Sequence, residues 1–130
     1  MSSKTDIPNP SKYEWRFEQR GGVGIWFMEG WQGFADEDLD AASDHYRERG
    51  KRSDIKATLA VFGDGTSLAR ETQEYMGEIW SENGAYTGVD RIGFVSEGTT
   101  AIAVKAAVDI PGAAVESFSD LDEAVEWAQA

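Results

Sequence analysis

Hydroxyl and carboxyl side chains gather in one short turn, residues 63–67 with the sequence GDGTS. The turn follows an apolar run at residues 55–62 and precedes a helical pattern that reaches Trp80. In α/β proteins a site commonly lies where a central strand passes through such a turn into a helix. Asp64, Thr66 and Ser67 are therefore the candidate site residues.

Three uses of the two hydroxyls stay open. Thr66 or Ser67 could cap the helix N-terminus, a contact that stabilises a helix by about 1 kcal/mol. Either could instead be phosphorylated, because a helix N-terminus tolerates or favours added negative charge. The same turn could bind a free anion. A nucleotide site is not indicated, because the lysine of a phosphate-binding loop is missing and Arg70 does not take its position.

Other catalytic groups are scarce in the sequence. His45 is the single histidine, and its place between Asp44 and Tyr46 on a polar helical pattern predicts a surface residue. The chain has no cysteine and no second histidine, which argues against a transition-metal site. No Gly-x-Ser-x-Gly nucleophile turn is present. We expect a protein that is not an enzyme and holds neither metal nor cofactor.

The charge of the chain restricts its partners. The 130 residues include 24 acidic and 12 basic side chains, which gives a net charge of −12 at pH 7. Such a field repels nucleic acid and anionic lipid, so neither is an expected partner. Two explanations stay open, a surface adapted to a salt-rich cytoplasm and an acidic surface that binds a basic partner.

The sequence also suggests a location and a domain plan. The lack of cysteine fits a reducing interior, and no apolar run approaches the roughly 20 residues that cross a bilayer. We therefore expect a cytoplasmic protein with no transmembrane segment. Residues 1–12 are expected to form a disordered tail, and residues 13–130 a single domain.

Five segments have strand patterns. Residues 13–20 alternate between aromatic and polar side chains, which predicts a strand with one wet face. Gly21-Gly22 predicts a hairpin turn, and residues 23–31 a second strand that is apolar on both faces. The run at residues 55–62 predicts a central strand buried on both faces. Two further strands are expected, at residues 89–96 and 113–118.

Two helices are expected in the first two thirds of the chain. Residues 35–49 predict a surface helix that ends at a left-handed Gly50. The helix after the turn carries Met76 and Trp80 on its apolar stripe and is expected to stop at Asn83-Gly84. Gly77 within it predicts either close packing on the sheet or a kink.

Two more helices are expected near the end of the chain. Thr99 is the expected N-cap of the first. Its face toward the sheet should be a stripe of small residues and one isoleucine, namely Ile102, Ala103, Ala106 and Ala107. Residues 119–122, with the sequence SDLD, resemble a capping box for the last helix.

The order of elements is β-β-α-β-α-β-α-β-α. It predicts an α/β fold with a mixed, mostly parallel sheet that is opened by an N-terminal hairpin and covered by helices. Four segments within residues 13–129 resemble the SpoIIAA-like branch of the STAS/SEC14-like α/β family. They are the opening hairpin, residues 30–39 (GWQGFADEDL), the strand-turn-helix at residues 57–69 and the ending at residues 118–128 (FSDLDEAVEWA). The strand start at residues 90–95 (DRIGFV) is similar as well.

The resemblance implies a regulatory domain. In the anti-sigma-factor antagonists of this family, a partner kinase phosphorylates a serine in the turn after the central strand, and that turn resembles Asp-Ser-Ser/Thr-Gly. Asp64 would match the family aspartate, and Thr66 or Ser67 its hydroxyl residue. Gly65 stands where the first serine would be. Some relatives of this architecture are thought to hold apolar ligands.

Two functions are expected from these observations. The first is a non-enzymatic domain that acts by protein contact, with self-association as a homodimer among the contacts considered. The second is a binding protein for a small apolar or lipid-like ligand. The large side chains of residues 26–31 cannot all point to one face of a strand, so a helix, a partner or a ligand must cover some of them. The candidate contact residues are Trp26, Trp31, Trp80 and Tyr86.

Overall fold

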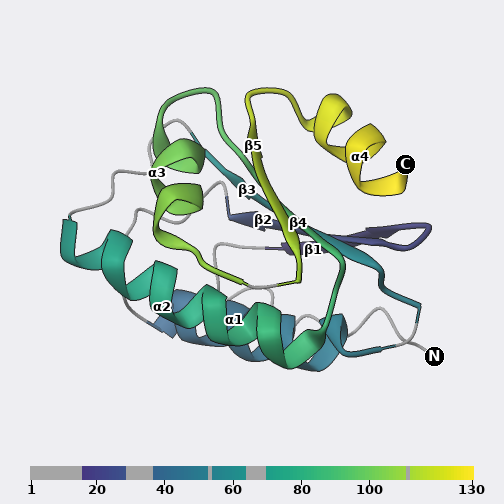
Figure 1. Ribbon diagram of the computed structural model, residues 1–130, viewed down its shortest axis with the longest axis horizontal. Helices are drawn as coiled ribbons and strands as arrows, with labels where there is room; N and C mark the ends of the chain where they lie inside the picture. The colour runs from purple at the N-terminus through teal and green to yellow at the C-terminus, as the bar shows by residue number, and fades with distance from the viewer. Residues whose placement is uncertain (1–15, 29–36, 53, 64–69, 111) are drawn as a thin grey trace.

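The computed structural model describes residues 16–28, 37–52, 54–63, 70–110 and 112–130 (Figure 1). Nine elements follow one another in these ranges. They are β1 (Arg16–Arg20), β2 (Val23–Met28), α1 (Glu37–Gly50), β3 (Ala57–Phe62), α2 (Arg70–Thr87), β4 (Arg91–Val95), α3 (Thr100–Ala107), β5 (Ala114–Phe118) and α4 (Leu121–Gln129). The predicted alternation of strands and helices is confirmed.

The five strands form one sheet in the order β1-β2-β3-β4-β5. β1 and β2 are antiparallel, and each later pair is parallel. The predicted α/β class, the opening hairpin and the central place of β3 are therefore confirmed. We call the end where β2 to β5 begin the amino edge, and the end where they finish the carboxyl edge.

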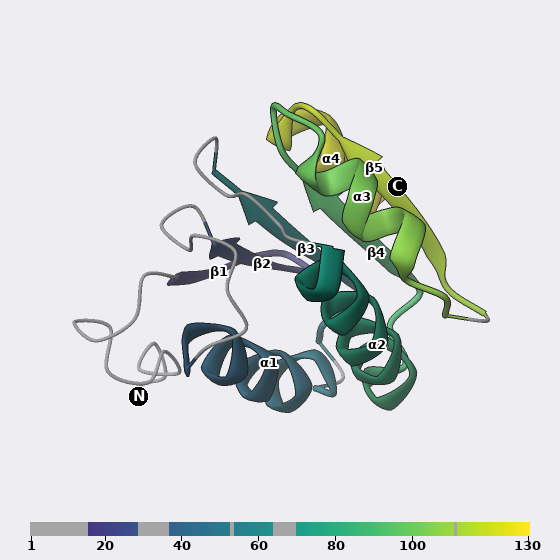
Figure 2. The same cartoon turned by 90° about the vertical axis from the view of Figure 1, so that its left-hand side faces the viewer.

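The helices cover the sheet unevenly. Figures 1 and 2 show α1, α2 and α3 on one face and α4 on the other. Because the strand order never reverses, crossovers of one hand bring the three connecting helices to the same face. Each face has its own core, one containing Tyr46 and Trp80 and the other Leu59 and Ala124.

Strands β2 and β3 are buried on both faces, as their apolar runs predict. In β2, Trp26 and Met28 lie in the core under α1 and α2, whereas Ile25 and Phe27 lie in the core under α4. This alternation follows from the two-residue period of a strand. The described aromatic residues of β2, Trp26 and Phe27, are thus divided between the two cores.

Two predicted helix ends are wrong. α2 continues past Gly84 to Thr87 and is followed by Gly88, whose φ of +72° suits a left-handed helix stop. Gly84 is buried, and a Cβ there would lie 2.9 Å from Ile92 Cδ1. Gly50 is the last residue of α1, has no left-handed φ, and lies against Thr87. Both glycines serve close packing.

Gly77 also serves close packing, although against a helix and not the sheet. A Cβ at Gly77 would lie 2.6 Å from Ala107 Cβ, so the missing side chain lets α2 approach α3. The predicted face of α3 is wrong, because Ala101 and Val104 are buried while Ile102 is 59% exposed. The small residue Ala107 faces the neighbouring helix.

The caps of the last two helices differ from the prediction. Thr99 is the N-cap residue of α3, as predicted, but its side chain makes no cap hydrogen bond. The N–H of Ala101 instead donates to Ser96 Oγ at 2.9 Å. α4 is capped by Asp120, whose carboxylate accepts from the N–H of Asp122 at 3.4 Å. The SDLD segment does begin the helix, with its aspartate and not its serine as the cap.

Candidate functional site at the carboxyl edge

A hollow of about 340 Å³ lies at the carboxyl edge of the sheet. Open α/β sheets bind ligands outside the carboxyl ends of their strands, so this hollow is where the topology favours a site. Its lining comes from the ends of β3 and β4 and the start of α4. The lining residues are Val61, Phe62, Gly63, Val95, Ser96, Glu97, Ser119, Asp120 and Leu121.

A buried hydroxyl group, that of Ser96, is part of the lining of the hollow. Ser96 is buried, and its Oγ donates to the carbonyl of Gly98 at 3.1 Å while accepting from Ala101 N–H. The N–H of Ser96 donates to the carbonyl of Phe118 at 3.0 Å, which joins the ends of β4 and β5. These bonds commit Ser96 to holding the loop that follows β4.

The rim of the hollow is acidic. Glu97 and Asp120 both line it and are exposed, and none of the lining residues is a lysine or arginine. Two serines add hydroxyl groups. Such a lining suits a hydrogen-bonding or cationic group better than a free anion, although the N-terminus of α4 partly offsets the charge.

The predicted turn begins at this hollow. Gly63 is the last described residue after β3 and lines the hollow. Asp64, Thr66 and Ser67 follow it directly but lie outside the described residues, so their role stays a prediction. Trp31 also lies outside the described residues.

Two of the other predicted contact residues lie in the core under α1 and α2. Trp26 and Trp80 are 1% and 2% exposed, and both pack against Tyr46, with ring centroids 4.8 and 5.4 Å apart. Neither lines the hollow. Tyr86 is 43% exposed near the end of α2, on the opposite side from Gly63 along the strands. The structure therefore does not bring these residues together at one site.

No protein-family model matches the chain, and no curated protein or solved structure is significantly similar to it. The family resemblance stays a prediction. Within the described ranges, no helix is long and apolar enough to cross a membrane. The same ranges contain no group of three or more His, Asp or Glu side chains arranged to hold a metal ion.

The prediction that His45 is a surface residue is wrong. His45 is buried, and its Nδ1 accepts a hydrogen bond from Trp26 Nε1 at 2.8 Å. Burial lowers the pKa of His45 to about 4, so the imidazole is neutral at pH 7. The sequence held a signal for this placement, because His45 lies three residues after Ala42 and next to Tyr46 on the apolar stripe of α1.

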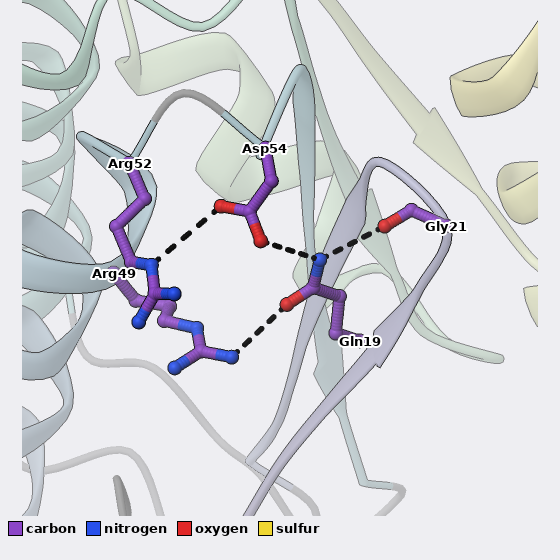
Figure 3. A network of polar contacts seen from close by, with 5 residues as sticks. All are labelled: Gln19, Gly21, Arg49, Arg52 and Asp54. Atoms are coloured by element: carbon purple, nitrogen blue, oxygen red, sulfur yellow. Dashed lines mark hydrogen bonds and ion pairs between the residues drawn. The ribbon is translucent and has the colours of Figure 1, made fainter. Parts of the chain in front are cut away.

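A polar network lies at the amino edge, where the sequence indicated only a helix end (Figure 3). Gln19 Nε2 donates to Asp54 Oδ2 at 3.2 Å and to the carbonyl of Gly21, while its Oε1 accepts from Arg49 Nη2 at 3.0 Å. Arg52 Nε lies 3.6 Å from Asp54 Oδ1. The Gln19 bond comes first among the causes that lower the pKa of Asp54. The network ties the hairpin to the end of α1 and to the approach to β3.

Proposed function

We propose that this chain is a non-enzymatic STAS/SpoIIAA-like domain that binds another protein at the carboxyl edge of its sheet. The observation that carries the proposal is the hollow of about 340 Å³ beside Gly63. A partner would contact the hollow and the turn at residues 64–69. Thr66 or Ser67 would be the regulatory handle.

The chemistry of the rim supports a switch. A phosphate adds a charge of about −1.5 to −2 at pH 7, which exceeds the charge of either Glu97 or Asp120. Thr66 and Ser67 follow closely in sequence after Gly63, and Gly63 lines the hollow. Phosphorylation would therefore change the affinity for a charged partner by a larger step than the loss of one rim carboxylate.

The core supports a function without catalysis and without a buried ligand. The single histidine is neutral at pH 7 and bonded to Trp26 inside the protein, so it is not presented to a substrate. The alternative of an apolar ligand near Trp26 and Trp80 has less support. Their rings pack on Tyr46, and a ligand would have to displace these contacts.

The experiment fills the hollow and asks whether a partner is lost. Ser119 lines the hollow and is exposed, so Ser119→Trp should occupy the space without disturbing the core. Ala106→Trp, at an exposed position of α3, is the control for an added indole. In affinity capture from cells that make the protein, we expect one partner with the wild type and with Ala106→Trp, and its loss with Ser119→Trp.

Two outcomes would contradict this function. If Ser119→Trp still bound the same partner, the hollow would not be part of the contact. Intact-mass spectrometry that finds Thr66 and Ser67 unmodified under every growth condition would remove the phosphorylation handle, whereas an added phosphate that is lost in Thr66→Ala/Ser67→Ala would support it.

A further inference from the structure

Strand β5 is an open edge of the sheet, at the opposite end from β1. Figure 1 shows it at the front of the molecule, with α3 on one side and α4 on the other. The N–H of Ala114 and the carbonyl of Phe118 bond to the backbone next to the two ends of β4, at 2.9 and 3.0 Å. Backbone groups of successive strand residues point to alternate sides, so those of Val115 and Ser117 point away from β4. No described residue bonds to them, and they form a free edge that a further strand could join.

A lysine side chain passes around this free edge. Val115 packs against the core under α1 and α2, whereas Phe118 packs against the core under α4. Because strand residues alternate between the two faces, Glu116 points to the same face as Phe118. Lys105 belongs to α3 on the other face, yet its Nζ lies 3.3 Å from Glu116 Oε1. Exposed ion pairs of this kind contribute little to stability, so the pair can open when a strand approaches.

An apolar side chain lies beside the free edge, on the face of the sheet that α3 covers. Among the large hydrophobic residues that the structure describes, Ile102 of α3 is the most exposed, at 59%. It is three residues before Lys105, and residues with this spacing are neighbours on the surface of a helix. Since Lys105 reaches β5, Ile102 also lies on the β5 side of α3. This helix packs against β4 and β5, so a strand added beyond β5 would cover Ile102.

Two carboxylates lie beside the free edge on the opposite face of the sheet. One is that of Glu116, which is exposed. The other is that of Glu123, an exposed residue of α4 one turn before Trp127, whose ring lies 5.3 Å from that of Phe118 in β5. Glu123 is therefore on the β5 side of α4. Arg91 lies one strand further in, where its Nη1 donates to the carbonyl of Trp127.

We propose that β5 binds an extended segment of a partner protein as an additional strand, and that this segment alternates apolar and basic residues. Its backbone bonds to the outward N–H and C=O groups of β5, which supplies affinity, while its alternate side chains supply specificity. On one face its apolar side chains cover Ile102. On the other face its basic side chains meet Glu116 and Glu123, and one of them replaces Lys105 as the partner of Glu116.

A second copy of this chain suits the free edge less well than a basic segment does. In a two-fold pairing centred on β5, Glu116 of each copy lies directly opposite Glu116 of the other, and like charges at that position are destabilising. The net charge of −12 on each copy adds repulsion at longer range. A basic segment is instead attracted by the same charge.

The probe for this site is a fluorescent peptide of four Val-Lys pairs with both ends capped. Its binding to the purified protein is measured by fluorescence anisotropy, and we expect saturable binding. A capped peptide of four Pro-Lys pairs carries the same charge but lacks half of the backbone donors and cannot continue a sheet. It should bind at least about tenfold more weakly, which separates strand pairing from attraction by charge alone.

A proline variant tests the backbone contact. Ser117→Pro removes an outward N–H of β5 and leaves the bonds to β4 in place, so it should bind the Val-Lys peptide about tenfold more weakly. Ser117→Ala keeps the N–H and should bind like the wild type. Amide hydrogen exchange gives the same test without a variant. Saturating peptide should slow exchange at Val115 and Ser117 about tenfold and leave Ala114, which bonds inward, unchanged.

A charge-reversal variant tests the side-chain contact. Glu116→Lys places a lysine against the basic side chains of the peptide and should weaken binding about tenfold. Glu82→Lys makes the same charge change at an exposed position of α2, away from β5, and is the matched control. It should bind about as tightly as the wild type. Equal losses in the two variants would show attraction by net charge and would overturn the proposal.

Three further results would overturn the proposal. They are the absence of saturable binding, equal binding of the Pro-Lys peptide, and a wild-type dimer that is lost in Ser117→Pro, which would assign the edge to a second copy. The site goes beyond the proposed function, because it uses the outer edge of β5 and not the hollow. A peptide that fails to bind would leave the hollow and its partner untouched, and a partner still bound by Ser119→Trp would not bear on β5.

Discussion

The two edges of the sheet differ in how they are joined. At the amino edge, backbone N–H groups cross from strand to strand, from Lys56 to the carbonyl of Gly22, from Asp90 to that of Lys56, and from Ala114 to that of Asp90. At the carboxyl edge, the corresponding bond in the described residues runs from Ser96 to Phe118. A continuous set of backbone bonds therefore joins the described part of the amino edge, and the hollow lies at the carboxyl edge.

Side chains deepen this difference. The amino edge adds the network around Gln19, and Arg91 Nη1 donates to the carbonyl of Trp127 at 2.7 Å, near the end of α4. The carboxyl edge instead exposes Glu97 and Asp120 around the hollow. Loops at the carboxyl ends of strands are regions that α/β proteins commonly use for binding. The described contacts of the amino edge thus stabilise the fold, and the hollow that carries our functional proposal lies at the other edge.

The largest expected effect concerns His45, which links α1 to the hairpin. Its pKa is 6.5 in an unfolded chain and about 4 in the fold, so between these values the unfolded state binds the proton and the folded state does not. The free energy of unfolding should therefore fall as pH decreases through this window, by up to about 3 kcal/mol.

Urea unfolding at several pH values measures this dependence. His45→Gln is the comparison variant, because it removes the titrating imidazole while the carboxylates of the protein still titrate. The difference in slope between wild type and variant should lie between pH 6.5 and about 4. Parallel curves for the two proteins would show that His45 is not buried as a neutral side chain.

A smaller effect tests the two edges against each other. Gln19→Ala removes the residue that joins Asp54 and Arg49, and it should reduce the free energy of unfolding by about 1 kcal/mol. Ser119→Ala removes an exposed hydroxyl at the hollow and should change the free energy of unfolding by less than about 0.5 kcal/mol. Chemical denaturation of both variants gives the comparison. Equal losses would mean that the edges do not differ in stabilising the fold.

Much of the fold could be predicted from the sequence because its strongest patterns are local. The alternation at the hairpin, the apolar run of β3 and the SDLD segment before α4 each specify an element within a few residues. The centre of the sheet followed from burial of β3 on both faces, since only an inner strand can be covered twice.

The wrong predictions concern contacts between elements distant in the sequence. Gly84 has the pattern of a helix stop, but it lies inside α2, where any side chain would overlap with Ile92 and Ile110. The predicted buried stripe of α3 was chosen because its residues are small. The hydrogen bond from Ala101 N–H to Ser96 Oγ instead sets which side of α3 faces the sheet. His45 is polar, and the hydrogen bond that it accepts from the indole of Trp26 helps to make its burial favourable.

The candidate site was predictable in place but not in composition. The strand-turn-helix pattern located the carboxyl end of β3, where the hollow lies. Glu97, Ser119 and Asp120 reach the same hollow from elsewhere in the chain, and nothing in their local sequence links them to the turn. Parallel order alone brings the ends of β4 and β5 to the end of β3.

Amide hydrogen exchange tests the difference between the two edges most directly. In the free protein, the amides of Lys56, Asp90 and Ala114 should be among the slowest to exchange, because each donates across the amino edge. The exposed amides of residues 97–99 beside the hollow should exchange fastest, and should slow when a partner binds. Fast exchange at Lys56, Asp90 and Ala114, or a partner that protects the amino edge instead, would contradict the account.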